Sequence, residues 1–142
     1  MKMTAEEMWK ASGLTGEYEA WSFGGDPDGL ANLVARGIKT ATCSAYELYE
    51  IEGEALPEIG ERSVILDSKE NAICIIETTK VYLKRFDEVA ADHAFKEGEG
   101  DRSLTYWRKV HRDFFEGEMK TVGRHFDEKM MLVCEEFGVI YR

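Results

Sequence analysis

The stretch from Val64 to Leu83, VILDSKENAICIIETTKVYL, decides how the chain folds. Two apolar, β-branched runs, Val64–Leu66 and Ile73–Leu83, flank the polar residues Asp67–Asn71. This pattern is typical of a β-hairpin with a short connection. The second run is long and almost continuously apolar or β-branched, so we expect it to be a central strand.

Helices are indicated on the N-terminal side of the hairpin. Thr4 can cap a first helix, with Glu7 as its capping-box partner and Gly13 as its stop. A turn over residues 24–28, with an Asp at the cap, leads to a second helix that ends at Gly37.

Helices are also indicated on the C-terminal side. The pattern predicts one helix over Phe86–Lys96, followed by the stops Gly98 and Gly100. Ser103 can cap a further helix, whose apolar stripe contains Leu104, Trp107, Val110, His111 and Phe114.

The remaining segments predict short strands. Tyr18–Phe23 and Thr40–Ala45 are strand candidates, and Tyr46–Glu52 is a helical turn or a loop. Met130–Val133 and Phe137–Tyr141 form either a closing pair of strands or one bent strand. Strands scattered among helices without a βαβ period predict an α+β fold with a small mixed sheet or barrel.

Composition limits the function classes. The chain has 142 residues, 44% hydrophobic and 32% charged, which predicts one globular domain over residues 1–142. The net charge of −10 disfavours non-specific binding to polyanions, although basic clusters occur around Lys84 and Arg108. No apolar run is long enough for a membrane span and the N-terminus has no apolar leader, so we expect a cytoplasmic protein that binds no membrane.

Cysteine usage gives no sign of a metal or a disulfide framework. Cys43, Cys74 and Cys134 are odd in number and contain no CxxC pair, so we expect small buried apolar side chains. We predict no metal site and no cofactor.

A lysine and two threonines form the first candidate for chemistry. Gly37 ends a helix, and the chain then enters a strand through Lys39, Thr40 and Thr42. Residues two apart in a strand share a face, so the two threonines lie together. A lysine held out of bulk water near a hydroxyl can act as a base or stabilise an alkoxide, although a solvent-exposed lysine beside β-forming threonines fits the same pattern.

Acidic and histidine side chains form the second candidate. Residues 92–101, DHAFKEGEGD, alternate acids with glycine, which suits either an acid/base site or an acidic surface loop. An EF-hand ligand pattern is absent. His111 is either a catalytic base or a packed core residue, and the neighbouring aromatic residues serve either for stacking or for the core.

Six blocks in this order, together with His111 and Phe114-Phe115, resemble the ASCH domain family over about Trp21 to Tyr141. The blocks are WSFG (21–24), GIKTAT (37–42), LPEIG (56–60), EGEGD (97–101), YWR (106–108) and VCEEF (133–137). The resemblance implies a PUA-like fold, which is a small mixed or antiparallel β-barrel flanked by helices and related to RNA-binding modules. It also implies a cleft beside the Gly-x-Lys-x-x-Thr segment.

The resemblance also implies an activity. Small bacterial members of the family remove the acetyl group from the exocyclic amine of acetylated cytidine, using a lysine, a threonine and a glutamate. These positions correspond to Lys39 and Thr42 and, after the His-Ala-x-x-Glu pattern, to Glu97. By residue type and position we expect further substrate contacts from Trp21, Thr40, Glu99, Asp101, Trp107 and His111.

The chain departs from these small hydrolases in three places: an N-terminal helical extension over residues 1–17, a Gly-rich acidic loop after Glu97, and the continuation TATCS over residues 40–44. The sequence therefore allows three interpretations. The first is a hydrolase of an acetylcytidine-like amide, in which either Lys39 or Glu97 is the base. The second is a PUA-like RNA-binding module without catalysis, and the third is a metal-dependent ribonuclease that uses Glu97, Glu99 and Asp101.

Overall fold

The predicted hairpin forms the middle of the fold. In the computed structural model, which describes residues 2–142, β3 (Arg62–Leu66) pairs antiparallel with β4 (Ala72–Arg85). The Asp67 side chain accepts hydrogen bonds from the backbone N–H groups of Lys69 and Asn71 and closes the connection. The polar residues between the two apolar runs thus form the turn that the sequence predicts.

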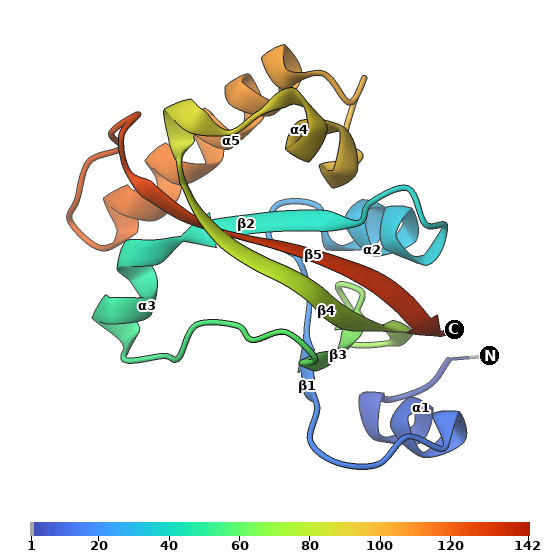
Figure 1. Cartoon of the computed structure of the whole chain (residues 1–142). Coiled ribbons are helices and arrows are strands. Elements are labelled where there is room, and N and C mark those ends of the chain that lie inside the picture. The colour runs from blue at the N-terminus through green and yellow to red at the C-terminus, as the bar shows by residue number, and fades with distance from the viewer. Residues whose placement is uncertain (1) are drawn as a thin grey trace.

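The strands form one mixed, curled five-stranded sheet in the order β1-β3-β4-β5-β2. The outer strands are β1 (Glu19–Trp21), which runs parallel to β3, and β2 (Ala41–Ala45), which is antiparallel to β5. The C-terminal run is a single long strand, β5 (Met131–Tyr141), which pairs with β4 along its length. β4 and β5 curve together across the molecule and give the sheet the shape of a half-barrel (Figure 1). This confirms the predicted α+β fold.

The helices begin and end near the predicted residues. They are α1 (Ala5–Ser12), α2 (Pro27–Ala35), α3 (Tyr46–Glu52), α4 (Ala91–Glu97) and α5 (Leu104–Thr121). Thr4 and Glu7 form a reciprocal capping box at α1, and Asp26 and Ser103 cap α2 and α5 through their side chains.

The single helix predicted over Phe86–Lys96 is wrong. A short 3-10 turn, η1 (Phe86–Glu88), is separated from α4 by extended residues Val89 and Ala90. Phe86 and Val89 are both buried in the same apolar cluster. Val89 and Ala90 both have extended backbone angles, so a continuous helix cannot run through them.

Three apolar clusters hold the layers together. Met8 and Trp9 of α1 pack on Val64 and Ile75 of the hairpin. The second cluster joins α2 to β3, β4 and β5, and the third joins α4 and α5 to the other end of the sheet. Each large side chain that is fully buried contributes roughly 1.5–3 kcal/mol. As a result, α4 and α5 are fixed beside β2 (Figure 1).

Within residues 2–142, no helix combines the length and the apolar character that crossing a membrane requires.

Candidate functional site

Lys39 is carried into the interior by the junction between α2 and β2. Gly37 adopts a left-handed conformation with φ 74°, and the backbone N–H groups of Ile38 and Lys39 both donate to the Leu33 carbonyl. This tight helix end turns the Lys39 side chain inward, where it is 1% exposed. The Thr40 N–H donates to the Lys96 carbonyl at 2.7 Å and ties this junction to α4.

The three N–H groups of the Lys39 ammonium all have acceptors in the protein. Its Nζ donates to the Ala41 carbonyl at 2.9 Å, to Glu97 Oε1 at 3.2 Å and to Glu99 Oε2 at 3.0 Å. Burial lowers the pKa of Lys39, but the charges and hydrogen bonds of the two glutamates raise it more, so that the pKa lies above the ordinary 10.5. Lys39 is therefore a buried cation.

Glu97, the last residue of α4, is surrounded by donors. Its Oε2 accepts from His93 Nε2 at 2.7 Å and from Trp107 Nε1 at 2.8 Å, while Oε1 lies 3.3 Å from His111 Nε2 in addition to Lys39. Burial raises the pKa of Glu97, but the Lys39 charge and the hydrogen bonds of the two histidines outweigh it and hold the pKa well below 4.5. The carboxylate is ionised and fully coordinated by hydrogen-bond donors.

Two glycines deliver Glu99 to the same place. Gly98 and Gly100 have φ values of 75° and 58°, and a Cβ on Gly100 would lie 2.4 Å from the Tyr106 ring. A Cβ on Gly98 would lie 2.7 Å from the Ile38 carbonyl oxygen. Only glycine fits this turn, which brings the Glu99 carboxylate onto Lys39 while leaving its side chain 19% exposed.

These groups face one pocket of about 580 Å³, a volume suited to a small ligand. Lys39, Thr42, Glu97, Glu99 and His111 all line it, together with apolar and aromatic side chains. The aromatic members are Phe23, Tyr106 and Phe114. The structure thus brings the predicted lysine, threonine and glutamate to a single cavity from two separate segments of the chain.

Four other predicted contacts lie elsewhere. Trp107 is 2% exposed and holds Glu97 from the core, so its ring has no free face for a substrate. Trp21 lines an adjoining recess of about 840 Å³, which shares Thr42 with the first pocket. Thr40 and Asp101 are outside the lining of the pocket within the described chain, and Asp101 accepts instead from the Ser103 N–H.

His93 is a member of the site that sequence reasoning did not select. Its Nε2 bonds Glu97 and its Nδ1 bonds the Tyr82 hydroxyl at 2.8 Å. The available signal was the spacing of four residues between His93 and Glu97, which places them on one face of a helix. Cys43 also departs from the expectation, because it is half-buried and lines the pocket, whereas Cys74 and Cys134 are buried as expected.

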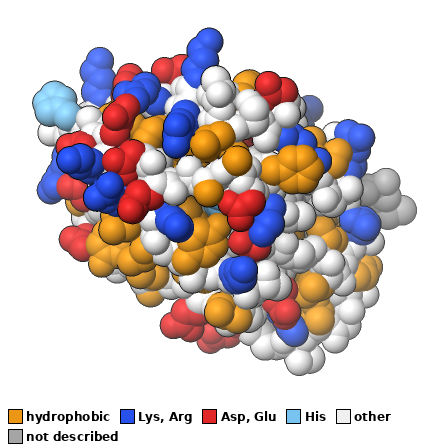
Figure 2. All heavy atoms as spheres, turned by 45° about the horizontal axis from the view of Figure 1, so that its top comes forward, with side chains coloured by type: hydrophobic (Ala, Val, Ile, Leu, Met, Phe, Trp, Pro, Cys, Tyr) orange, Lys and Arg blue, Asp and Glu red, His pale blue; other side chains and the backbone are white. Residues whose placement is uncertain are grey.

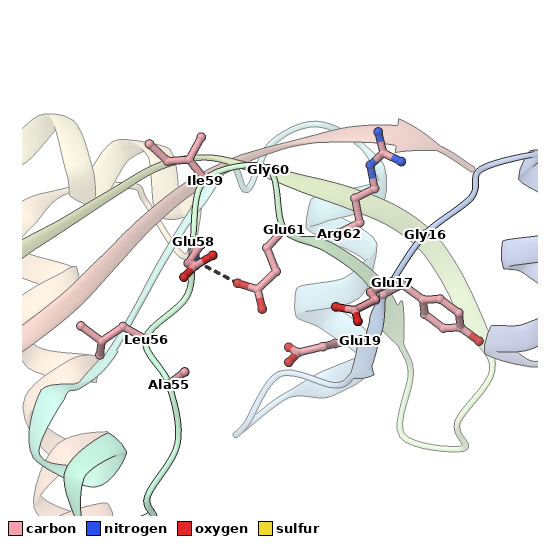
Figure 3. Close-up of a pocket in the computed structure, with 11 residues that line it drawn as sticks. Gly16, Glu17, Glu19, Ala55, Leu56, Glu58, Ile59, Gly60, Glu61 and Arg62 are labelled. Carbon is pink, nitrogen blue, oxygen red and sulfur yellow. Dashed lines mark hydrogen bonds between the residues drawn. The ribbon is translucent and has the colours of Figure 1, made fainter.

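A separate hollow of about 900 Å³ carries carboxylates but none of the predicted site residues (Figure 3). Glu17, Glu19, Glu58 and Glu61 line it, and the one guanidinium at its edge, Arg62, is paired with Glu77. Glu61 also lines the adjoining recess, next to the half-buried Glu135. Burial, and then the charge of Glu61, raise the pKa of Glu135 to about 7.

The donor set around Glu97 does not fit a metal centre. One oxygen or nitrogen each of Glu97, Glu99 and His111 lie within 4.8 Å of one another. However, the Lys39 ammonium contacts both carboxylates and already supplies the balancing positive charge. A cation would have to displace a lysine that is 1% exposed.

Comparisons with known proteins identify the family. The ASCH domain family model matches residues 19–141, so the chain belongs to the ASCH domain family. The crystal structure of an ASCH domain from Lactobacillus crispatus JV V101 is 34% identical and superposes with a TM-score of 0.90, over 96% of this chain and 94% of that chain. Protein EF3133 from Enterococcus faecalis V583 is 33% identical, with a TM-score of 0.86 over 96% and 85% of the two chains. The half-barrel with its helices is therefore the PUA-like fold of this family.

No curated protein matches the chain in the corresponding sequence comparison.

Proposed function

We propose that this ASCH protein is a hydrolase that removes an acyl group from the exocyclic amine of a nucleoside-like substrate of the N(4)-acetylcytidine type. The observation that carries the proposal is that Lys39, Thr42 and Glu97 line one pocket with room for a nucleoside. The three residues correspond to the lysine, threonine and glutamate that the family resemblance implies.

The chemistry assigns a different task to each group. Thr42 supplies the nucleophilic hydroxyl, which attacks the acyl carbon and forms an oxyanion. Lys39 stays an ammonium, because two carboxylates hold its charge, so it stabilises the oxyanion rather than acting as the base. Glu97 is the fixed negative charge that keeps Lys39 in position.

The apolar part of the pocket suits a planar base. Phe23, Tyr106 and Phe114 line it, and Tyr106 and Phe114 each keep 37% of their surface exposed. A nucleobase stacking on an aromatic ring gains about 1–3 kcal/mol. Tyr106 and Phe114, the two exposed rings, replace Trp21 and Trp107 as the candidates for stacking in this pocket.

RNA binding without catalysis is the second candidate. A small recess of about 180 Å³ beside α4 carries Lys80, Lys84 and Lys96, which could contact phosphate, although Asp92 and Glu136 line it as well. On the face above α4 and α5, basic side chains are interspersed with acidic ones instead of forming a continuous field (Figure 2). Together with the net charge of −10, this favours a small substrate over a polyanion.

A deacetylation assay tests the proposal. The wild type is incubated with N(4)-acetylcytidine, and cytidine is separated by chromatography; we expect turnover that Lys39→Met and Thr42→Val abolish. Thr79→Val is the matched control, because Thr79 is exposed on β4 outside the pocket. Absence of turnover by the wild type, combined with tight binding of single-stranded RNA that weakens steeply with salt, would favour the second candidate.

A further inference from the structure

Both ring nitrogens of His111 face hydrogen-bond acceptors in the pocket. Its Nδ1 lies 2.9 Å from the Trp107 carbonyl oxygen, and its Nε2 lies 3.3 Å from Glu97 Oε1. A carbonyl and an ionised carboxylate are both acceptors, whereas a neutral imidazole has only one N–H. A bare Nε2 would point its lone pair at a carboxylate, so the ring is stabilised in the doubly protonated form.

His93 provides an internal comparison on the same carboxylate. Its Nε2 also faces Glu97, but its Nδ1 faces the Tyr82 hydroxyl, which can donate a hydrogen bond. A neutral His93 therefore satisfies both of its partners. Of the two histidines around Glu97, only His111 lines the pocket.

The charges around His111 support the same state. Burial lowers the pKa of His111, but the hydrogen bond and charge of Glu97, the charge of Glu99 and the Trp107 carbonyl raise it above the ordinary 6.5. The positive charge of Lys39, which contacts the same Oε1 of Glu97, opposes this. The Trp107 ring stacks on the imidazole at 4.3 Å and fixes its plane.

Of the other titratable groups of the pocket, Glu97 and Lys39 are poor proton carriers, whereas Glu99 is free to accept a proton. Glu97 accepts from four donors and has no proton to give. The pKa of Lys39 lies above the ordinary 10.5, so the ammonium keeps its proton at neutral pH. Glu99 has a single contact, to Lys39, and is the more exposed of the two carboxylates, so it retains free acceptor capacity.

We propose that His111 and Glu99, rather than Glu97, carry the protons of the reaction: Glu99 accepts the proton of the Thr42 hydroxyl, and His111 donates a proton to the leaving amine. This inference rests on the proposed hydrolase function and assigns roles within it. An acid whose pKa lies near the working pH is the most effective proton donor to a leaving group.

Thr42 Oγ attacks the acyl carbon while its proton passes to Glu99, and the oxyanion is held by Lys39. The C–N bond then breaks, the carbonyl re-forms, and the amine nitrogen takes the Nε2 proton of His111, which leaves an acyl ester on Thr42. Water attacks the ester and gives its proton to His111, and Thr42 Oγ leaves with the proton from Glu99. Both groups return to their starting states.

A comparison of two leaving groups tests the roles. The amide N(4)-acetylcytidine needs a proton on its leaving nitrogen, whereas the ester 4-nitrophenyl acetate releases a stable phenolate that needs none. We expect His111→Gln to slow the acylation step, followed as release of the leaving group in a single turnover, by about 10²–10⁴-fold on the amide and by less than about 10-fold on the ester. Glu99→Gln should slow both substrates, and His125→Gln, at an exposed histidine outside the pocket, should change neither.

The charge state of His111 is measured without any substrate. We expect ¹⁵N NMR at pH 7 to show both ring nitrogens of His111 protonated, with His111→Gln used to assign the signals. A bare Nε2 at that pH overturns the proposal, and so does an equal loss on both substrates in His111→Gln. A wild type that hydrolyses neither substrate refutes the hydrolase function itself, whereas turnover by the wild type that His111→Gln leaves intact refutes only the donor role.

Discussion

The Lys39 pocket and the acidic hollow beside β1 and β3 both gather carboxylates, but they treat them in opposite ways. In the pocket, Glu97 and Glu99 lie on a buried ammonium, and two histidines and an indole satisfy the remaining oxygens. In the hollow and the recess next to it, burial and then the charge of Glu61 raise the pKa of both Glu19 and Glu135, and no cation pairs with either of them within the described chain.

The carboxylates of the pocket are therefore held ionised by opposite charge and hydrogen bonds, whereas Glu135 at the recess is not. In the pocket, the pKa of Glu97 is lowered despite complete burial, so the carboxylate stays charged and keeps Lys39 in place. At the recess, the pKa of Glu135 is raised to about 7, so the carboxyl group takes up a proton close to neutral pH. Pre-organised charge of the first kind is what stabilisation of an oxyanion requires.

The largest effect is expected from removing the cation of the pocket. Lys39→Met leaves two carboxylates without their partner, one of them fully buried, and breaking a buried ion pair costs about 3–5 kcal/mol. Urea unfolding at pH 7 measures the loss. The double variant Lys39→Met with Glu97→Gln should recover part of it, and a Lys39→Met protein as stable as the wild type would contradict the picture of a tightly coupled cluster.

In the recess, removing a charge should stabilise the protein, whereas removing the Lys39 charge from the pocket destabilises it. Because the folded-state pKa of Glu135, about 7, exceeds its ordinary 4.5, the native protein loses stability as pH rises from about 4.5 through 7. Glu135→Gln removes this loss, so we expect it to stabilise the protein by about 2 kcal/mol at pH 8 and very little at pH 4. Thermal unfolding at the two pH values measures the difference, and equal effects at both would show that Glu135 titrates normally.

A substitution in the loop that carries Glu99 should have an intermediate effect on stability. Gly100→Ala must adopt a positive φ and also place a Cβ 2.4 Å from the Tyr106 ring, whereas Gly123→Ala, with φ 72°, meets nothing within 4 Å. We expect Gly100→Ala to destabilise the protein by about 1–2 kcal/mol more than Gly123→Ala does. Chemical denaturation of the two variants provides the comparison, and equal losses would mean that the Tyr106 ring moves away freely.

The smallest expected effect distinguishes the two causes of the raised pKa of Glu135. Burial is the larger cause and the charge of Glu61 the next, so Glu61→Gln should lower the pKa of Glu135 while leaving it above 4.5. An NMR titration of the Glu135 carboxyl group follows this change. A pKa that falls all the way to 4.5 would mean that repulsion, and not burial, dominates in the recess.

Local signals in the sequence predicted much of the fold. The capping box of Thr4 and Glu7, the cap at Ser103 and the hairpin over Val64–Leu83 depend on residues close in the chain, and the structure contains all of them. The break between Phe86 and α4 was missed because it is set by burial of Val89 against α5 and the sheet, which no local pattern records.

For the candidate site, too, some features could be predicted from the sequence and others could not. A family resemblance selected Lys39, Thr42 and Glu97 from the sequence. That they lie in one pocket depends on contacts between segments almost 60 residues apart. The sequence could not show that Trp107 turns its indole N–H onto Glu97, or that both nitrogens of His111 face acceptors. Such facts follow from side-chain orientation in the assembled core.

The acyl intermediate on Thr42 tests the central claim most directly. Wild-type protein is mixed with N(4)-acetylcytidine, quenched within a single turnover and digested, and the peptides are analysed by mass spectrometry. The account predicts one acetyl group on the peptide that contains Thr42, bound to its hydroxyl oxygen, and none in Thr42→Val. Release of cytidine by a Thr42→Val variant at the wild-type rate would contradict it.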